Sequence, residues 1–203
     1  MSVITVSRQF GAGGRTLGEM VAEKLGYELY DNEVIQMVAE QAKVSANSVD
    51  ALEKETGGIF KKVIADIVPK SLKDLIVSRN QETIDEEIYV DILQKIITEI
   101  AESGNAVIIG RGSQYILKDR ENIIHVLITG EGKDREKFLE EKYDLTHDQA
   151  AHAVSHDDRR RANLYRKFAV TDYDQPDRYH LVLNTSKLDF DTACELICEL
   201  VKP

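Results

Sequence analysis

The sequence has few of the features that mark secreted or membrane proteins. Its two cysteines, Cys194 and Cys198, are too few for a disulfide framework, and their spacing of four on a predicted helix favours free thiols. No apolar run approaches the roughly 20 residues of a membrane-spanning helix. The N-terminal residues also lack the layout of a signal peptide. We therefore expect a cytoplasmic protein that has no membrane among its partners.

Positive charge is scarce as well. The chain of 203 residues carries 36 acidic and 26 basic residues, which gives a formal net charge of −10. A protein that binds nucleic acid without sequence specificity needs a basic surface, so we expect no nucleic-acid partner. Local clusters of basic residues can still bind an anion within an acidic protein. The length favours a single domain over residues 1–203.

Strand-like and helix-like segments alternate along the chain. Short apolar runs predict five strands, at residues 3–6, 27–30, 106–109, 123–128 and 180–184. Helical periodicity predicts helices at residues 15–25, 33–41, 82–102, 133–168 and 189–202. This alternation predicts an α/β fold in which the strands form a parallel sheet with right-handed crossovers. Ligands of such sheets bind beyond the carboxyl ends of the strands.

Residues 44–80 follow neither periodicity clearly. Gly57-Gly58 breaks this stretch, and Pro69 follows. We expect it to form the helices of an insert rather than a part of the sheet.

A glycine-rich segment follows the first predicted strand. Gly11, Gly13 and Gly14 lie within four residues, and they precede a cation and a hydroxyl at the start of a helix. Backbone N–H groups of such a loop can bind phosphate oxygens, and the start of the helix adds positive potential. The alternative is an ordinary glycine-rich turn between a strand and a helix.

Two phosphate-binding patterns compete for this segment. The dinucleotide pattern G-x-G-x-x-G fails because Thr16 stands at the third glycine position. The P-loop pattern G-x-x-x-x-G-K-[ST] fits better, although Gln9 replaces its first glycine and Arg15 its lysine. Arginine can bind phosphate through its forked cation, and Thr16 keeps the hydroxyl that a P-loop offers to Mg²⁺. We therefore predict a phosphate-binding loop made of Gly11, Ala12, Gly13, Gly14, Arg15 and Thr16.

Four segments resemble the cytidylate kinase-like family of P-loop phosphotransferases. They are residues 7–16, Tyr30-Asp31, residues 107–113, and residues 158–165 with 177–186. The resemblance covers nearly the whole chain apart from about 44–80. It implies a three-layer P-loop kinase fold, with a helical monophosphate-binding insert at about 44–80 and a mobile lid at about 155–170. It also implies transfer of the γ-phosphoryl group of ATP, with Mg²⁺ as cofactor, to CMP or dCMP.

The resemblance implies roles for residues at the expected site. Asp31 lies where similar kinases place an acid near both the metal and the acceptor nucleotide, so Thr16 and Asp31 are candidate Mg²⁺ ligands; an Asx turn is the alternative for Asp31. The forked cation of Arg111 suits the acceptor phosphate, unless it is a surface arginine in a turn. Gly112 stands where better-known cytidylate kinases have an aspartate, which leaves Asp31 as the substitute. Arg79, at the insert, is a further candidate for binding the acceptor.

The lid candidate is the basic segment at residues 157–167. Its five cations and two acids give it a net charge of +3 (5 − 2) in a chain of −10. Arg159 and Arg166 are seven residues apart and can share one helical face, whereas Arg161 points elsewhere. Arginines that close over phosphates stabilise the charge that develops in phosphoryl transfer; a solvated, charged helix face is the alternative. The candidate catalytic residues are therefore Arg15, Arg111, Arg159, Arg161 and Arg166.

Three functions stay open on these residues. The sequence favours an ATP-dependent nucleoside monophosphate kinase that acts on CMP or dCMP. The rivals are a P-loop kinase for another small acceptor and a non-catalytic nucleotide-binding regulatory protein. Arg8, next to the loop, either contacts phosphate or anchors the turn. The oligomeric state is open too, with a homodimer among the options.

Overall fold

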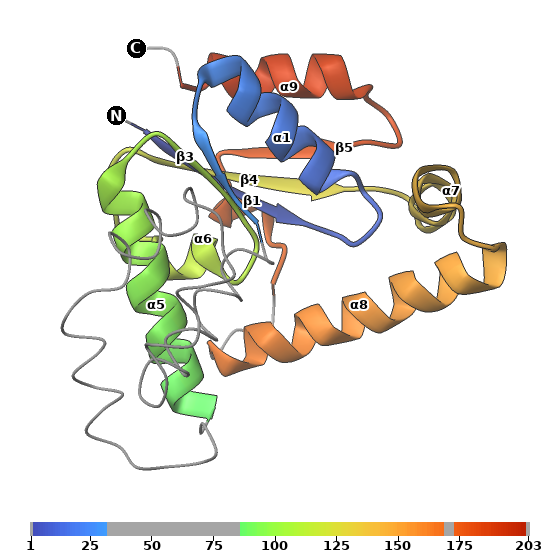
Figure 1. The fold of residues 1–203 in the computed structure, drawn as a ribbon, viewed down its shortest axis with the longest axis horizontal. Coiled ribbons are helices and arrows are strands. Elements are labelled where there is room, and N and C mark those ends of the chain that lie inside the picture. The colour runs from blue at the N-terminus through green and yellow to red at the C-terminus, as the bar shows by residue number, and fades with distance from the viewer. Residues whose placement is uncertain (1, 32–85, 169–172, 202–203) are drawn as a thin grey trace, which may run out of the picture. The chain divides into compact units, whose positions relative to one another are not determined.

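The computed structural model describes residues 2–31, 86–168 and 173–201 (Figure 1). Backbone contacts divide the chain into two compact units, Met1–Asp31 with Gly104–Pro203, and Asn32–Ser103. The predicted helix at 33–41, the insert at 44–80 and Arg79 lie outside the described residues.

A sheet of five parallel strands forms the centre of the first unit (Figure 1). The strands are β1 (Val3–Arg8), β2 (Glu28–Tyr30), β3 (Ala106–Ile109), β4 (Ile123–Thr129) and β5 (Leu181–Asn184), in the order β2-β3-β1-β4-β5. Every residue of β3 is buried, and so is β1 up to its last residue, as expected for the middle of a parallel sheet. The five predicted strands are confirmed, and their bounds differ from expectation only at the ends.

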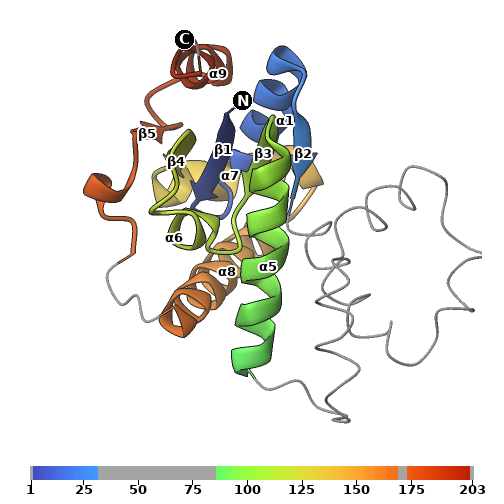
Figure 2. The same ribbon diagram turned by 90° about the vertical axis from the view of Figure 1, so that its left-hand side faces the viewer.

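Helices lie on both sides of this sheet, which confirms the predicted three-layer α/β fold (Figures 1 and 2). One side carries α1 (Gly14–Leu25) and α9 (Phe190–Glu199). The other side carries α6 (Ser113–Ile116) and the end of α8 (His147–Lys167). A further helix, α7 (Gly132–Tyr143), connects β4 to α8, and a short 3₁₀ helix, η2 (Pro176–Arg178), precedes β5.

The core of the first unit lies between the sheet and the α1–α9 layer. Leu17 of α1 and Ile197 of α9 are fully buried in one cluster with Ile4 and Val126 of the sheet. Cys194 and Cys198 of α9 belong to the same cluster and are free thiols, as predicted from their spacing. They therefore serve as small apolar side chains in the core.

The stretch predicted as one helical segment at 133–168 is two helices, so that prediction was wrong. After α7 ends, Asp144 takes a left-handed conformation with φ of 53°. Thr146 then caps α8: its hydroxyl accepts from the Gln149 N–H, and the Gln149 side chain accepts from the Thr146 N–H. Such a capping box starts a new helix, because it satisfies N–H groups that have no earlier helical turn to bond.

The described part of the second unit is α5 (Glu86–Ser103), which precedes β3 in the chain. Its buried residues include Leu93, Ile96, Ile97 and Ile100, which the spacing of apolar residues predicts as one face. No helix within the described ranges is long and apolar enough to cross a membrane.

Candidate functional site

The glycine loop joins β1 to α1 and takes backbone conformations that favour glycine. Gly11 and Gly13 have φ of 80° and 75°, in the left-handed region. Space is limiting too, because a Cβ on Gly11 would lie 2.6 Å from the carbonyl oxygen of Arg135. A Cβ on Gly14 would lie 2.6 Å from the Cβ of Arg8. The glycines thus let the loop pack directly against its neighbours.

The start of α1 supplies backbone donors of the kind that bind phosphate. The helix starts at Gly14, with Gly13 as its N-cap and no side-chain cap. Leu17 N donates to the Gly13 carbonyl at 3.0 Å. The N–H groups of Gly14, Arg15 and Thr16 precede this bond, and the helix dipole adds positive potential there. This geometry is what the predicted phosphate-binding loop requires.

Gln9, which replaces the first glycine of the P-loop pattern, holds the loop in place. Its side-chain oxygen accepts a hydrogen bond from the Gly130 N–H at 3.1 Å, and its own N–H donates to the Ile128 carbonyl at 2.9 Å. The Thr185 hydroxyl donates to the Ala12 carbonyl at 3.1 Å. These bonds tie the loop to the carboxyl ends of β4 and β5, so the departure from the pattern at Gln9 has a structural role.

Two predicted site residues, Arg15 and Asp31, form an ion pair. Arg15 Nη2 lies 3.1 Å from Asp31 Oδ2, and Arg15 Nε donates to Glu19 Oε1 at 3.1 Å. The Asp31 side chain is 10% exposed, whereas that of Arg15 is 50% exposed. Because Asp31 directly follows β2, its carboxylate lies at the carboxyl edge of the sheet. A phosphate at this place would compete with Asp31 for Arg15, and a metal ion would compete with Arg15 for Asp31.

Asp31 and Thr16 fit a magnesium ion that is bound together with a nucleotide. Mg²⁺ usually takes one or two protein carboxylates and completes its shell with phosphates and water. Asp31 supplies a carboxylate, and Thr16 a hydroxyl in the first turn of α1. In the part of the chain that the structure describes, no group of three or more His, Cys, Asp or Glu could hold a metal ion. A metal site here would therefore depend on the phosphates.

Arg111 lies just beyond the carboxyl end of the strand next to β1. Val6 of β1 pairs with Ile109 of β3, and the Gly110 N–H donates to the Val6 carbonyl at 3.0 Å. Gly110, Arg111 and Gly112 have φ of 75°, 55° and 73°. A left-handed arginine is uncommon, and such conformations cluster at binding sites. The turn therefore places Arg111 at the same edge as the glycine loop.

Gly112 is crowded by the end of α8. A Cβ there would lie 2.7 Å from the ring of Phe168, the C-cap residue of α8, and its φ of 73° would be strained for most side chains. An aspartate at this position, as in better-known cytidylate kinases, would require the Phe168 ring to move. Asp31, the predicted substitute, lies beside Arg15, as does Glu19.

Arg8 ends β1 and lies among three further arginines. Burial, followed by the positive charges of Arg161, Arg111 and Arg160, lowers the pKa of Arg8 to about 10. Arg8 still carries its charge at neutral pH. Arg160 pairs with Asp157 and Arg161 with Asp174, so these carboxylates offset part of the positive field around Arg8.

Arg161, a predicted catalytic residue, is engaged in a buried network. Its side chain is 13% exposed. Arg161 Nε donates to the Tyr165 hydroxyl at 3.0 Å, and the two Nη atoms donate to the carboxylate of Asp174 at 2.6 and 2.5 Å. Burial disfavours its charge, but the hydrogen bonds and the attraction of Asp174 outweigh this and raise the pKa of Arg161. These bonds therefore connect α8, through Arg161, to Asp174 in the segment that follows the helix.

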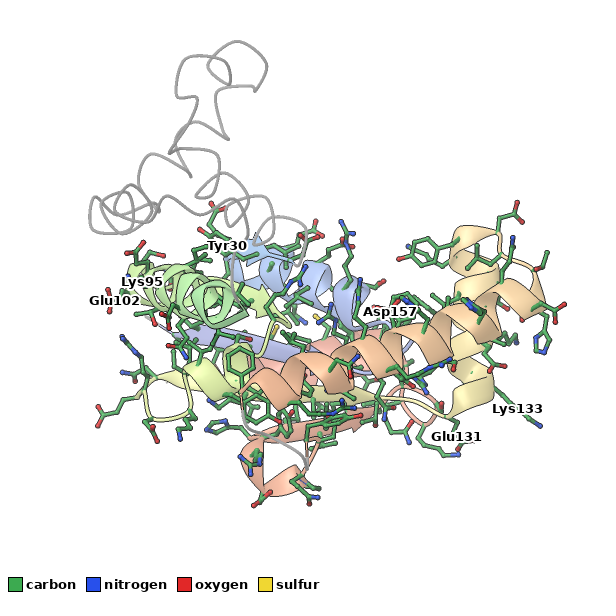
Figure 3. The ribbon with its side chains drawn as sticks, turned by 90° about the horizontal axis from the view of Figure 1, so that it is seen from below. Tyr30, Lys95, Glu102, Glu131, Lys133 and Asp157 are labelled. Atoms are coloured by element: carbon green, nitrogen blue, oxygen red, sulfur yellow. The ribbon has the colours of Figure 1, made fainter. Side chains whose placement is uncertain are left out.

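Arg159, Arg160 and Arg166 lie on the exposed side of α8. Arg159 donates to a serine one turn earlier in its own helix, and Arg160 pairs with Asp157, which is labelled in Figure 3. Arg161 differs from Arg159 and Arg166 in exposure, and the role predicted for these arginines over phosphates stays a prediction. The exposed arginines are accessible to a ligand.

Arg135, for which the sequence holds no local signal, joins the glycine loop to α8. Its Nη1 donates to the Phe10 carbonyl at 3.0 Å. Nη1 and Nη2 also donate to the two carboxylate oxygens of Asp158, at 3.1 and 3.0 Å. A bidentate pair fixes the geometry of both groups. Arg135 therefore couples α7, the loop and the arginine-bearing part of α8.

Comparison with known proteins agrees with this fold. The model of the cytidylate kinase-like family matches residues 3–187. A solved structure of an uncharacterized protein from Eubacterium ventriosum ATCC 27560 is similar, with a TM-score of 0.69, 20% identity, and coverage of 99% of this chain and 98% of that chain. Shikimate kinase from Bacteroides thetaiotaomicron is similar with a TM-score of 0.52, 16% identity, and coverage of 98% of both chains. At these identities the structures support the fold alone. A search of the curated proteins gives no match.

Proposed function

Because the chain belongs to the cytidylate kinase-like family, we propose that it is an ATP-dependent nucleoside monophosphate kinase whose preferred acceptor is CMP or dCMP. The observation that carries the proposal is that the glycine loop, the Arg15–Asp31 pair and Arg111 lie at the carboxyl edge of one sheet. Phosphoryl transfer depends on positioning and charge stabilisation rather than on a covalent enzyme intermediate. The backbone donors of the glycine loop would position the phosphates, and the arginines would stabilise their charge.

The donor phosphates would bind at the glycine loop. N–H groups at the start of α1 would bind phosphate oxygens, and Arg15 would take the place of the P-loop lysine. Half of the Arg15 side chain is already exposed, so it can turn from Asp31 to a phosphate. Asp31 would then be released, and together with Thr16 it would hold Mg²⁺. When bound, this ion neutralises charge on the phosphates.

The acceptor phosphate would bind nearer β3. Arg111 at the end of that strand, assisted by Arg8 at the end of β1, would bind its oxygens and orient one of them for in-line attack on the γ-phosphorus. Arg159 and Arg166 would close over the phosphates from α8, because both are exposed. Arg161 would position that part of α8 through Asp174. Arg79 stays a prediction from the sequence.

A coupled assay of ADP release tests the proposal. Full-length protein is incubated with ATP–Mg²⁺ and, in separate reactions, CMP, dCMP, UMP, AMP, GMP or shikimate. We expect the highest kcat/KM with CMP or dCMP. ADP release with shikimate alone would instead indicate a P-loop kinase for another acceptor. ATP binding without ADP release from any acceptor would indicate a nucleotide-binding regulator, and either result would contradict the proposal.

Arginine variants distinguish a loss of acceptor binding from a structural defect. Arg111→Ala should raise the acceptor KM and lower kcat, with a combined loss of roughly 10- to 100-fold and with ATP affinity nearly intact, because it removes a charge-assisted contact. Arg120→Ala is the matched control, since Arg120 is an exposed arginine in the turn after α6. Equal losses of ATP and acceptor affinity in Arg111→Ala would mean that Arg111 is structural.

A further inference from the structure

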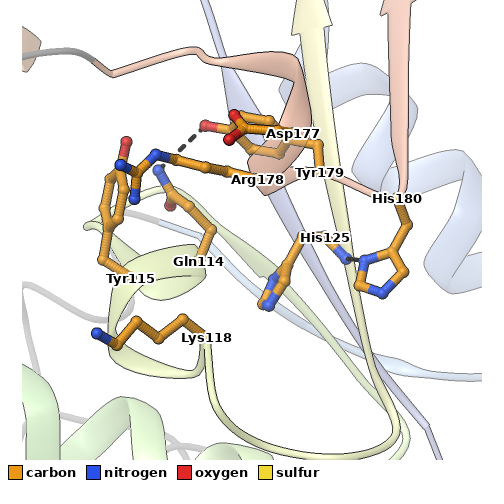
Figure 4. A pocket seen from close by; sticks show the side chains of 8 residues that line it. All are labelled: Gln114, Tyr115, Lys118, His125, Asp177, Arg178, Tyr179 and His180. Carbon is orange, nitrogen blue, oxygen red and sulfur yellow. Dashed lines mark hydrogen bonds between the residues drawn. The ribbon is translucent and has the colours of Figure 1, made fainter.

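A cavity of about 340 Å³ lies beside the first half of β4, and Figure 4 shows the side chains that line it. They come from α6 and the turn after it, from β4, from η2 and from the two residues before β5. His125, the third residue of β4, pairs with Thr5 of β1, three residues before Arg8. At about 3.3 Å per residue, the cavity lies roughly 10 Å back along the strands from the carboxyl end of β1. It is therefore separate from the glycine loop.

The cavity has a polar floor and a charged rim. Gln114 and His125, in the floor, are 3% and 5% exposed. Lys118, Asp177 and Arg178 are exposed at the rim. Lys118 Nζ also lies 3.8 Å from a carboxylate oxygen of Asp119, but both of these side chains are largely exposed, so an anion in the cavity can compete for the lysine. Small-molecule sites begin at about 300 Å³ and combine a closed floor with a few placed polar groups, as this cavity does.

His180 adds a hydrogen-bond donor whose tautomer is defined. Its Nδ1 accepts from the backbone N–H of His125 at 3.0 Å, the bond drawn dashed in Figure 4. A neutral His180 ring therefore carries its proton on Nε2 and can donate it to a ligand. The two imidazole rings lie 5.5 Å apart. Burial, together with this neighbour, lowers the pKa of His125 to about 4, so the positive charge at pH 7 comes from the rim cations.

Arg178 is held at the rim by an aromatic contact. Its guanidinium carbon lies 5.7 Å from the centroid of the Tyr115 ring, which is within cation–π range. Figure 4 shows Arg178 lying beside Tyr115 on one side of the cavity and Lys118 on the same side below it. The two cations are therefore placed to bind one ligand.

The floor of the cavity is continuous with the network that holds α8. Gln114 Nε2 lies 3.2 Å from the Tyr165 hydroxyl and 3.4 Å from the Tyr179 hydroxyl, as a donor to both. The same Tyr165 hydroxyl accepts a hydrogen bond from Arg161 Nε. A ligand that moves Gln114 would therefore act on the residues that anchor the lid candidate.

We propose that this cavity binds a small anion that carries a phosphate or carboxylate group. Lys118 and Arg178 neutralise the anion, His180 donates from Nε2, and Gln114 closes the floor. Through Gln114 and Tyr165 the bound anion acts on α8 as an effector. This second part rests on the proposed kinase function, whereas the binding itself does not.

Histidine-selective NMR on the full chain tests the binding. The imidazole signals of His125 and His180 are followed at constant pH and ionic strength, without nucleotide, during titration with inorganic phosphate and separately with citrate. We expect a saturable shift of the His180 signal with at least one probe, and the probe that gives it distinguishes phosphate from carboxylate recognition. The absence of a saturable shift with both probes would overturn the proposal.

Variants show whether the anionic probe binds in the cavity. The double variant Lys118→Gln with Arg178→Gln should bind at least about tenfold more weakly, since it removes two charge-assisted contacts. Arg15→Ala, in the glycine loop, and Lys133→Gln, an exposed lysine of α7 seen in Figure 3, should leave the His180 titration unchanged. Loss of the shift in Arg15→Ala but not in the double variant would overturn the proposal. Lys118→Gln alone gives the same test if the double variant does not fold.

Coupling to the kinase is measured separately. The ADP-release assay is run with and without the probe that binds, on wild type and on the double variant. A change in kcat/KM that only the wild type shows supports the effector role, and unchanged rates with a saturated cavity would overturn it. A chain that binds the probe but releases no ADP with any acceptor would refute the proposed function and leave the cavity site standing.

Discussion

Arginine–aspartate pairs occur in two regions of the molecule and are built differently. At the glycine loop, Arg15 Nη2 lies 3.1 Å from Asp31 Oδ2, and half of the arginine side chain is exposed. At the end of α8, Arg161 binds Asp174 through two nitrogens, and the side chains are 13% and 19% exposed. An exposed pair contributes little to stability, whereas a buried pair is costly to break. The first region can exchange its contacts for those of a ligand, and the second holds a helix in place.

The largest effect is expected from breaking the buried pair. Arg161→Ala leaves the poorly exposed Asp174 carboxylate without its bidentate partner and removes one hydrogen bond from the Tyr165 hydroxyl, which keeps the one from Gln114. We expect the free energy of unfolding, measured by chemical denaturation, to fall by about 3–5 kcal/mol. Arg159→Ala, on the exposed side of the same helix, should change it by less than about 0.5 kcal/mol. Small, equal losses in the two variants would show that the regions do not differ.

The opposite outcome is expected for Arg15→Ala. Its free energy of unfolding should fall much less than that of Arg161→Ala, because the Arg15 side chain is half exposed although that of Asp31 is only 10% exposed. On the proposed function, phosphoryl transfer should fall roughly 10- to 100-fold, because the variant lacks the cation proposed to bind the donor phosphates. ATP–Mg²⁺ at 100 times its Kd should stabilise the wild type by about 2.7 kcal/mol, and the variant less at the same concentration. A loss of stability as large as that of Arg161→Ala would place both pairs in one class.

Acid is expected to destabilise the sheet, because β4 contains a poorly exposed histidine that is kept neutral. His125 Nδ1 lies 2.7 Å from the Thr5 hydroxyl. Burial, and then the nearby His180, lowers the pKa of His125 from its ordinary 6.5 to about 4. The unfolded chain therefore takes up this proton first as the pH falls. The resulting stability is complete above pH 6.5 and is lost progressively between pH 6.5 and about 4.

This loss can be measured by denaturation at a series of pH values. Between about pH 7.5 and 5, His125 should account for roughly 2 kcal/mol of the fall in the free energy of unfolding. His125→Gln should remove that part of the pH dependence and can keep a hydrogen bond to Thr5. His152→Gln, at an exposed histidine of α8, should not change the slope. Parallel pH profiles for the wild type and His125→Gln would contradict the assignment.

The smallest effect is expected at Arg135, whose pair is intermediate between the two regions. The Arg135 side chain is 11% exposed and that of Asp158 is 38% exposed. Arg135→Lys keeps the charge but loses the fork, so it cannot bind both carboxylate oxygens and the Phe10 carbonyl. We expect a loss of about 1 kcal/mol in the free energy of unfolding. Lys137→Arg, on the exposed side of α7, is the control. A loss larger than that of Arg161→Ala would reverse the order proposed here.

Much of the fold could be predicted because it depends on local patterns. The apolar run of β3 is buried throughout, and Gly26 ends α1 in the left-handed conformation, with φ of 67°. The break between α7 and α8 was missed although a sequence signal existed. Thr146 and Gln149 have the spacing of a capping box, a local pattern that outweighs the helical character of the flanking residues.

The site could be predicted only where it is local in sequence. The loop from Gly11 to Thr16 is one continuous motif, so its residues could be named in advance. The Arg135–Asp158 and Arg161–Asp174 pairs join residues 23 and 13 apart, and tertiary packing rather than a motif brings them together. The sequence therefore marks Arg161 as one charge in a basic segment, and only the structure shows its engagement with Asp174.

The crowding of Gly112 by Phe168 couples the effects of substitutions at two positions that are far apart in the sequence. A side chain added at 112 meets both the aromatic ring and a left-handed backbone. Aspartate is among the few residues that tolerate this backbone. Gly112→Asp should therefore cost less stability when Phe168 is replaced by a smaller residue than in the wild type.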